Sequence, residues 1–268
     1  MKINGKYLKD LKLMLKFLTI ANKGISLNSI ALRRPTHVYR SDSCPAGLGG
    51  YSHDGFAWRW YLSEDLKFRA TNNLLEHLAA IISPWVDILA GRLKSEDCVL
   101  SMTDSTTAEG WLRKSNFSEL GESKLQASVR IEAARMQATL FMSHGIKSYS
   151  QWFSGGLNDV SDSLSRDDNR TDEELINIYR TACPSQIPHH FEIVPLPSEI
   201  TSWLTALLQK LPVNQQYSEV HTRSKLWLGI DGASTTDASG TQTSSSNHSP
   251  STRKSNSLEP LPWLCEKD

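Results

Sequence analysis

The 268-residue sequence contains little cysteine, and its cysteines form no paired motif. Its four thiols lie more than fifty residues apart, at Cys44, Cys98, Cys183 and Cys265. Zinc sites and dithiol redox motifs need cysteines at short, fixed spacings, so neither is expected here. We interpret the four residues as reduced thiols and expect an intracellular protein, either cytoplasmic or nuclear.

Long hydrophobic runs are also absent. The most apolar stretch, residues 74–90, contains Glu76, His77 and Asp87, whereas a membrane-spanning helix needs about 20 mainly apolar residues. The lysine-rich N-terminal residues lack the apolar core and small-residue cleavage site of a signal peptide. The sequence therefore predicts no membrane partner and no secretion.

The chain has no excess of charge of either sign, because 29 Lys and Arg residues balance 29 Asp and Glu residues. Binding of a polyanion must therefore rest on local charge. Residues 1–40 form such a region, since nine Lys and Arg residues stand there against Asp10 alone. The 39% of hydrophobic residues suffices for a core and excludes a wholly disordered protein.

Hydrophobic periodicity predicts an alternation of strands and helices. Short β-rich runs separated by turn residues predict three consecutive strands, over 36–43, 47–53 and 56–62. The next elements are predicted as a helix over 71–90, a strand over 97–103, helices over 105–114 and 122–143, and a strand over 146–153. Strands followed by alternating helices and strands indicate a mixed α/β sheet.

Changes in composition divide the chain into four regions. These are a basic amphipathic segment over 1–33, the main domain over 34–166, a helical appendage over 167–212, and a Ser/Thr-rich linker and tail over 213–268. Between residues 232 and 252, 12 of 21 residues are Ser or Thr. Such a stretch buries too little apolar surface to fold, so we expect it to be disordered.

The first region contains a helix, predicted over 7–21, that is both basic and amphipathic. Its apolar face and its lysines are Leu8, Leu11, Leu15 and Leu18, and Lys9, Lys12 and Lys16. A helix of this kind can lie on an acidic membrane, hold a phosphate backbone or pack on its own domain. The sequence leaves these alternatives open.

Four acidic residues stand at positions where carboxylates are unusual. Asp42 follows the first strand, Glu76 lies within an apolar helix, Asp104 ends the strand over 97–103, and Asp162 lies in a late helix. Each alone has a structural explanation, such as a helix N-cap for Asp104. Together they can converge at one end of a mixed sheet, where they would repel one another without cations. Two-metal phosphodiester hydrolysis is the chemistry that such a cluster favours.

The segments that carry these acids resemble, in order, those of the ribonuclease H domain of retroelement reverse transcriptases, in particular gypsy-like or DIRS-like elements. They are YRSDSCPAGLGGYS at 39–52, NLLEHLA at 73–79, MTDSTTA at 102–108 and NDVSDSLSR at 158–166. The resemblance covers about residues 34–166. It implies a ribonuclease H-like α/β fold: a mixed five-stranded sheet flanked by helices, with an N-terminal connection helix and a disordered C-terminal tail.

The resemblance also implies an activity and a site. Asp42, Glu76, Asp104 and Asp162 would hold two Mg²⁺ ions, or Mn²⁺ as a substitute, for cleaving the RNA strand of an RNA–DNA hybrid. The residues expected to contact the substrate are Ser43, Asn73, Ser105, Thr106, Trp111 and Arg113. A polymerase domain on a separate or longer chain is a further expected partner.

The sequence departs from the family in two ways. Residues 151–158 contain no His, although many members carry one in the corresponding loop, and His144 lies too early in the chain to substitute for it. The polymerase motif Tyr-x-Asp-Asp is also missing. One alternative is therefore a catalytically inactive relic that binds nucleic acid or protein.

A second alternative is a DNA strand-transfer nuclease on the same fold. It would use Asp42 and Asp104 with a downstream glutamate, either Glu109 or Glu132. The spacing argues against it, because Glu109 stands only five residues after Asp104 and Asp162 already occupies the position of the ribonuclease pattern.

Overall fold

The computed structural model describes residues 5–22, 34–114 and 122–213. The predicted tail lies outside these residues. The helices are α1 (Gly5–Ala21), α2 (Asn72–Leu89), α3 (Thr106–Arg113), α4 (Lys124–His144), the 3₁₀ turn η2 (Gly155–Leu157), α5 (Asp159–Arg166), α6 (Asp172–Ala182) and α7 (Ser198–Leu208). The strands are β1 (His37–Cys44), β2 (Gly47–Ser52), β3 (Phe56–Tyr61), β4 (Cys98–Thr103), β5 (Lys147–Trp152) and β6 (Glu192–Ile193).

The strands form one mixed sheet in the order β5-β4-β1-β2-β3-β6. Strands β1, β2 and β3 are an antiparallel meander, whereas β4 is parallel to β1 and β5 is parallel to β4. This confirms the predicted α/β class. The prediction of five strands was incomplete, because β6 pairs in parallel with β3. A strand of two residues in a proline-rich stretch has no periodicity that a sequence could reveal.

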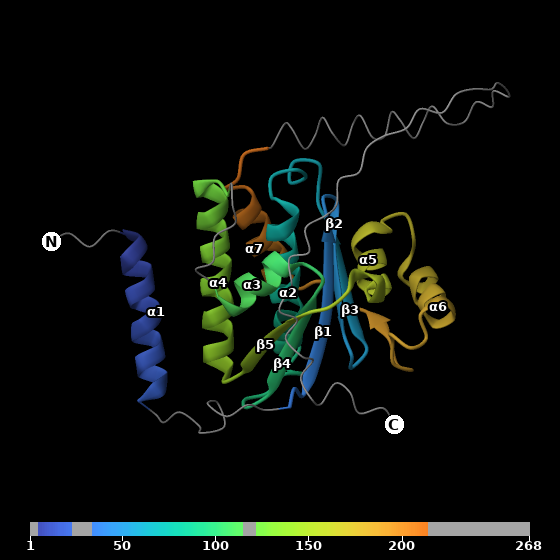
Figure 1. Ribbon diagram of the computed structural model, residues 1–268, viewed down its shortest axis with the longest axis horizontal. Helices are drawn as coiled ribbons and strands as arrows, with labels where there is room; N and C mark the ends of the chain where they lie inside the picture. Colours follow the sequence, from blue (N-terminus) through green and yellow to red (C-terminus); the bar gives the residue numbers. More distant parts are fainter. Residues whose placement is uncertain (1–4, 23–33, 115–121, 214–268) are drawn as a thin grey trace, which may run out of the picture. The chain divides into compact units, whose positions relative to one another are not determined.

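Helices cover both faces of the sheet (Figure 1). Helices α2, α3, α4 and α7 lie on one side, and α5 and α6 lie on the other. The larger core cluster joins α2 to α7 and includes Trp85, Ile200 and Leu204, which are at most 2% exposed. Although residues 167–212 were predicted as an appendage, they contribute β6 to the sheet and α7 to this core.

The glycines of β2 let α5 approach the sheet closely. A Cβ atom on Gly49 would lie 2.5 Å from the Cβ of Leu164, and one on Gly47 would lie 2.6 Å from the carbonyl oxygen of Ser165. On the opposite face, a Cβ on Gly50 would lie 2.5 Å from the Oγ of Ser83 in α2. Because β2 carries no side chains at these positions, α5 and α2 pack directly on its backbone.

Replacing Gly49 with Ala is therefore expected to destabilise the protein by about 2 kcal/mol or more, since overpacking a close contact typically costs 1–3 kcal/mol. The added methyl group would meet the backbone of Leu164 as well as its side chain. Urea unfolding measures the effect. Gly156→Ala is the matched control, because a Cβ there has no atom within 4 Å. Equal stability of the two variants would contradict this packing.

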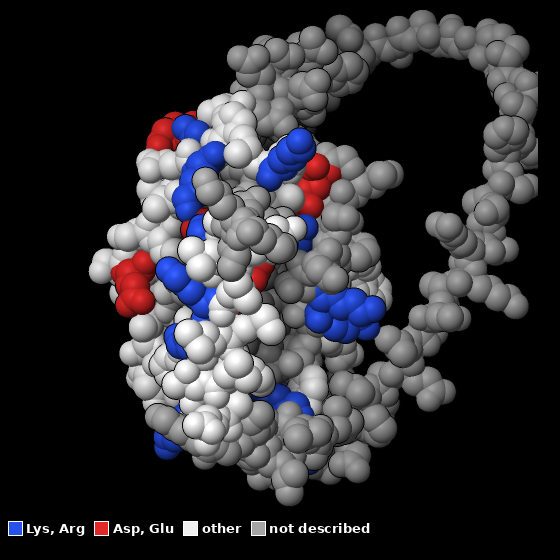
Figure 2. All heavy atoms as spheres, turned by 90° about the vertical axis from the view of Figure 1, so that its left-hand side faces the viewer, with Lys and Arg blue, Asp and Glu red and all other residues white. Residues whose placement is uncertain are grey.

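Helix α1 is present as predicted, but its leucine face does not pack on the described domain. Leu8, Leu11, Leu15 and Leu18 are 45–65% exposed. The helix contacts α4, where Asp10 Oδ1 lies 2.5 Å from Arg135 Nη2. Figure 2 looks onto this side of the molecule and shows Lys and Arg side chains at several separate points.

Helix α1 thus contacts its own domain through Asp10, with Lys9, Lys12 and Lys16 exposed, while most of its leucine face stays open, so packing on its own domain remains one of the alternatives. Within the described residues, none of the helices combines the length and the apolar character that crossing a membrane requires.

Candidate metal centre

The pairing of β1 with β4 brings Asp42 and Asp104 to the same level. The parallel register runs from His37 opposite Val99 to Arg40 opposite Met102. Continued by two residues, the same offset sets Asp42 beside Asp104, just after the ladder has ended. The two acids from distant parts of the sequence are therefore neighbours at the C-terminal ends of two central strands.

Glu76 reaches this place from helix α2, which begins after the N-cap Thr71. Its side chain is 3% exposed. The backbone N–H of Ser43 donates to Glu76 Oε1 at 3.1 Å, and the Ser43 hydroxyl donates to the same oxygen at 3.0 Å. Ser43 thus fixes one oxygen of Glu76 beside the strand that carries Asp42.

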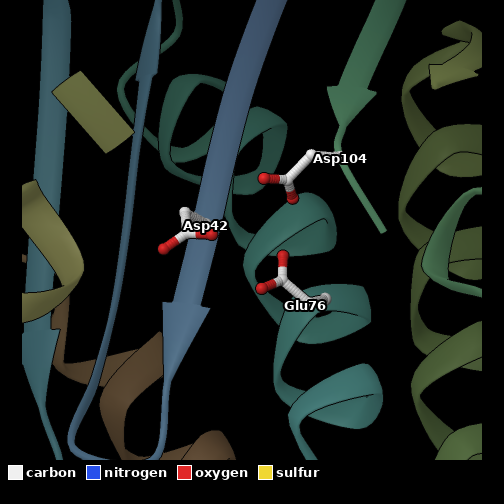
Figure 3. A group of neighbouring side chains, drawn as sticks. All are labelled: Asp42, Glu76 and Asp104. Carbon is white, nitrogen blue, oxygen red and sulfur yellow. The ribbon is translucent and has the colours of Figure 1, made fainter. Parts of the chain in front are cut away.

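Asp42, Glu76 and Asp104 form one carboxylate cluster (Figure 3). One oxygen of each residue lies within 4.8 Å of the corresponding oxygens of the other two. The Oε2 atom of Glu76 is buried and has no hydrogen-bond partner in the described part of the chain. Three carboxylates at this spacing, with an unpaired buried oxygen, offer the donor set that hard divalent cations prefer.

Burial and mutual repulsion disfavour the charged forms of these acids. Burial, followed by the charges of Asp42 and Asp104, raises the pKa of Glu76 to about 9. Burial also raises the pKa of Asp42 to about 6, although a hydrogen bond from Ser165 opposes this. The pKa of Asp104 is raised as well, mainly by burial. A bound cation would remove the repulsion, so the residues fit a metal ion.

Asp162, the fourth predicted ligand, lies near the cluster but outside it. Its charge contributes to the raised pKa values of Asp42 and Asp104. Its Oδ1 atom forms an ion pair of 2.6 Å with Arg166 Nη2, one helical turn later in α5. The same Arg166 nitrogen lies 3.9 Å from Asp42 Oδ2. In this structure a guanidinium group therefore neutralises the side of the site that Asp162 faces.

Three residues of this site were not predicted from the sequence. The Ser165 hydroxyl donates to Asp42 Oδ2 at 2.8 Å, and Arg166 pairs with two of the acids. Asn158 is 1% exposed, donates to the carbonyl oxygen of Ser41 at 3.3 Å, and lowers the pKa of Asp104 by hydrogen bonding. All three lie in the segment that carries Asp162, which was their only available signal.

The residues predicted to contact substrate are in different environments. Ser43 is 2% exposed and bonded to Glu76. Ser105 caps α3 by accepting from Ala108 N–H at 3.1 Å. Asn73 is partly exposed, and Thr106 and Arg113 lie at the surface. The structure thus leaves Asn73, Thr106 and Arg113 accessible, whereas Ser43 supports the cluster.

Trp111, which was expected to contact the substrate, is buried instead. Its side chain is 2% exposed and belongs to the main core. It makes an edge contact with His77, at 5.7 Å between ring centroids, and lies under the guanidinium of Arg130. Ala108 and Trp111 are three residues apart on the buried face of α3, and this spacing is typical of residues that pack a helix against a core.

The loop between β5 and α5 packs against the cluster through Gly155. A Cβ atom there would lie 2.8 Å from Asp104 Oδ2. His144 lies at the end of α4, where its Nδ1 atom is 2.8 Å from the carbonyl oxygen of Leu140. His144 is therefore hydrogen-bonded at the end of its own helix.

The acids of the strand-transfer alternative do not join the cluster. Glu109 Oε1 accepts a hydrogen bond from Ser150 at 3.2 Å, and Glu132 Oε1 accepts one from Lys210 at 2.5 Å. Among the described residues, the group of acids with metal-ligand spacing is Asp42, Glu76 and Asp104. The geometry therefore gives no support to Glu109 or Glu132 as the third ligand.

Comparisons with known proteins add little beyond the fold. No model of a protein family matches the sequence, and none of the curated proteins matches it. Among solved structures, 16 chains match. One is ribonuclease H1 from the halophilic archaeon Halobacterium salinarum NRC-1, with 18% identity and a TM-score of 0.32, over 49% of this chain and 93% of that chain. The strand order and the helices on both faces are those of a mixed α/β fold.

Proposed function

We propose that this protein is a divalent-metal-dependent nuclease that hydrolyses the RNA strand of RNA–DNA hybrids. The observation that carries the proposal is the carboxylate cluster of Asp42, Glu76 and Asp104, with oxygens within 4.8 Å of one another at the ends of two central strands. Buried acids that repel one another destabilise the folded state, and such clusters are typical of functional sites.

The residues of the cluster have distinct roles in this proposal. Asp42 and Asp104 hold the cations between the two strand ends, and Glu76 contributes its unpaired Oε2. Ser43 and Ser165 orient Glu76 and Asp42 by donating to their other oxygens. When bound, divalent cations activate water and neutralise the charge that develops on the phosphate.

Asp162 is proposed as the fourth ligand, which requires Arg166 to release it. Both side chains are partly exposed, at 43% for Asp162 and 55% for Arg166, so the ion pair can open without disturbing the core. An exposed pair of this kind contributes about 0.2–1 kcal/mol. The free energy of cation binding to Asp42 and Asp162 can exceed that contribution. Once released, Arg166 is available to bind a substrate phosphate.

Recognition of RNA would rest on hydroxyl and amide groups near the cluster, because the 2′-hydroxyl distinguishes RNA from DNA. Asn73, Ser105 and Thr106 lie at the starts of α2 and α3, and Arg113 lies at the end of α3. In the proposal the first three contact the RNA strand, and Arg113 contacts the DNA strand.

We also propose a retroelement origin, which the order of the four acid-bearing segments supports. A fragment of a retrotransposon polyprotein would work with a polymerase domain on a separate or longer chain, and it would act where the hybrid forms, in the cytoplasm or the nucleus. The region over 1–33 is then the connection to that polymerase, and 34–166 is the nuclease domain.

The test is a cleavage assay with the full chain and four labelled substrates: an RNA–DNA hybrid, double-stranded RNA, double-stranded DNA and single-stranded RNA. We expect cleavage of the RNA strand of the hybrid in Mg²⁺ or Mn²⁺, and no cleavage in chelator. Hybrid binding without cleavage in either metal would instead identify an inactive binding module. Cleavage of double-stranded DNA with equal rate would contradict the proposed substrate.

The lysines of α1 are expected to strengthen hybrid binding through the phosphate backbone. Lys9, Lys12 and Lys16 are all exposed. For B-form DNA, each phosphate contact contributes about −0.9 to the slope of log K against log salt, so each lost contact makes the slope shallower by about that amount. The triple variant Lys9→Gln, Lys12→Gln, Lys16→Gln should therefore bind more weakly and with a flatter salt dependence. Fluorescence anisotropy over a salt series measures both, and an unchanged slope would exclude this role.

A further inference from the structure

A hollow lies beside Arg40, which points to the same face of β1 as Asp42. It has a volume of about 380 Å³ and is lined by residues from β1, the turn after β2, the η2 turn and the segment after α6. The lining residues that matter here are Arg40, His53, Leu157, Ser185 and Gln186. Pockets for small ligands start at about 300 Å³. The hollow is therefore large enough for a ligand of the size of a mononucleotide.

The charge of this pocket favours an anion. Its lining contains the guanidinium of Arg40 and no carboxylate. Arg40 Nη1 donates to the carbonyl oxygen of Leu157 at 2.8 Å, and its Cζ atom lies 5.0 Å from the centroid of the Phe153 ring. Its Nε atom is buried and, within the part of the chain that the structure describes, has no hydrogen-bond partner. Among the residues that the structure describes, no carboxylate forms an ion pair with Arg40, so its positive charge is held at the pocket by the Leu157 carbonyl and the Phe153 ring.

Two acids near the lining have partners of their own, and one of those partners, Gln186, lines the pocket. Asp159 Oδ2 accepts a hydrogen bond from Gln186 Nε2 at 2.7 Å, and Asp54 lies 3.6 Å from His37 Nε2. Gln186 Oε1 is buried and has no partner among the described residues. His53 stacks on Tyr51, with ring planes 9° apart, which provides an aromatic surface at the pocket. The pocket therefore combines a cation, an amide and an aromatic ring.

The pocket adjoins the carboxylate cluster. Arg40 and Asp42 are two residues apart on β1, so their side chains point to the same face, about 7 Å apart along the strand. The η2 loop borders both places, because Gly155 packs against Asp104 while Leu157 accepts from Arg40. A phosphate chain that crosses the cluster can reach Arg40 within a short distance.

The geometry points to a nucleotide phosphate as the ligand of this pocket, with the guanidinium of Arg40 as its main contact. The phosphate can belong to a free mononucleotide or to a nucleotide of a bound strand next to the carboxylate cluster. The second source rests on the proposed function, and the first does not. In both cases the base would lie against His53 and near the amide of Gln186.

The test is a titration of the full chain with AMP in EDTA, followed by isothermal titration calorimetry and by the NMR signal of the His53 ring. We expect AMP to bind with a Kd of about 1 mM or lower and to shift the His53 signal, while the signal of His144, which is outside the pocket lining, stays in place. Inorganic phosphate should bind more weakly at the same site. Adenosine that binds as tightly as AMP would overturn the inference, because the phosphate would then not be recognised.

Two variants test the pocket itself. Arg40→Gln should weaken AMP binding about tenfold or more, which corresponds to ~1.4 kcal/mol. Ser185→Trp should block the pocket, and because Ser185 is an exposed residue of the lining, this change should affect the fold less than Arg40→Gln does. Thr181→Trp is its control, because Thr181 is exposed on α6 but outside the lining. AMP binding that is unchanged in both Arg40→Gln and Ser185→Trp would overturn the inference.

A hybrid arm separates this inference from the proposed function. If the pocket holds a nucleotide of the bound strand, Ser185→Trp should weaken hybrid binding in EDTA and AMP should compete with the hybrid. AMP binding without competition would assign the pocket to a free nucleotide and support the inference in that form. Failure of hybrid cleavage, with AMP binding intact, would remove the nuclease proposal alone.

Discussion

Replacing Asp104 with Asn is expected to reduce metal-dependent cleavage of the RNA–DNA hybrid by about 10³-fold, the order of loss seen when one group that stabilises transition-state charge is removed. The change keeps the size of the side chain and removes one of the three charges that would hold the cations. It also removes repulsion between the protein and the phosphate backbone. Hybrid binding should therefore be equal or tighter, while cleavage, measured with a labelled hybrid in Mg²⁺, is lost.

The matched control is Asp168→Asn, which removes the same charge from an exposed position after α5. This variant should cleave at nearly the normal rate. Neither change alters the N-cap of α3, where Ser105 accepts from Ala108 N–H, so both variants should fold. Normal cleavage by Asp104→Asn, or equal losses in the two variants, would exclude the cluster as the site.

The stability of the metal-free protein is expected to fall as the pH rises from 7 to 9. The pKa of Glu76 is raised from 4.5 to about 9, mainly by burial and then by Asp42 and Asp104. A raised pKa means that the folded state binds the proton more tightly than the unfolded state. The resulting stabilisation is complete below pH 4.5 and is lost as the pH rises through 9, at up to about 1.4 kcal/mol for each pH unit.

The pH range from 7 to 9 also separates Glu76 from its neighbours. Burial raises the pKa of Asp42 only to about 6, and burial lowers that of His77 from 6.5 to about 3, so the contributions of both residues to the pH dependence fade above pH 7. Glu76→Gln should therefore raise the free energy of unfolding in EDTA at pH 8.5 and flatten its pH dependence. Glu199→Gln, at an exposed position of α7, should change neither quantity.

Urea unfolding at pH 7, 8 and 9 measures this effect, with and without Mg²⁺. At pH 8.5, added Mg²⁺ should raise the free energy of unfolding of the unmutated protein more than that of Glu76→Gln. A cation that binds only the folded state stabilises that state by mass action. Parallel pH profiles for the normal protein and Glu76→Gln would show that Glu76 is not the buried, repelled acid described here.

The sequence was sufficient to predict most of the sheet and the acids that meet in it. Asp42 and Asp104 each stand where a β-rich run ends, and the ends of neighbouring parallel strands lie at one edge of a sheet. Glu76 stands in a mainly apolar helix that also contains His77 and Asp87, so its position alone did not mark it, and it was predicted from its place in order with the other acids. Order and spacing therefore predicted these acids without knowledge of their distances.

Other features depend on contacts that sequence patterns do not encode. The hydroxyl of Ser165 reaches Asp42 only because glycines in β2 let α5 approach the strands. The two residues of β6 join the sheet by pairing with β3 from more than a hundred residues away. In α1, the leucine spacing shows an apolar face but cannot show that the face is left exposed.

The most direct test of the metal centre is the anomalous diffraction of a crystal of the protein grown with Mn²⁺. We expect an anomalous peak among the carboxylates of Asp42, Glu76 and Asp104, with Glu76 Oε2 as one of the ligands. We also expect the peak to disappear in Asp104→Asn at the same Mn²⁺ concentration. Mn²⁺ bound elsewhere, or a protein that leaves these three carboxylates without a cation at millimolar Mn²⁺, would contradict this expectation.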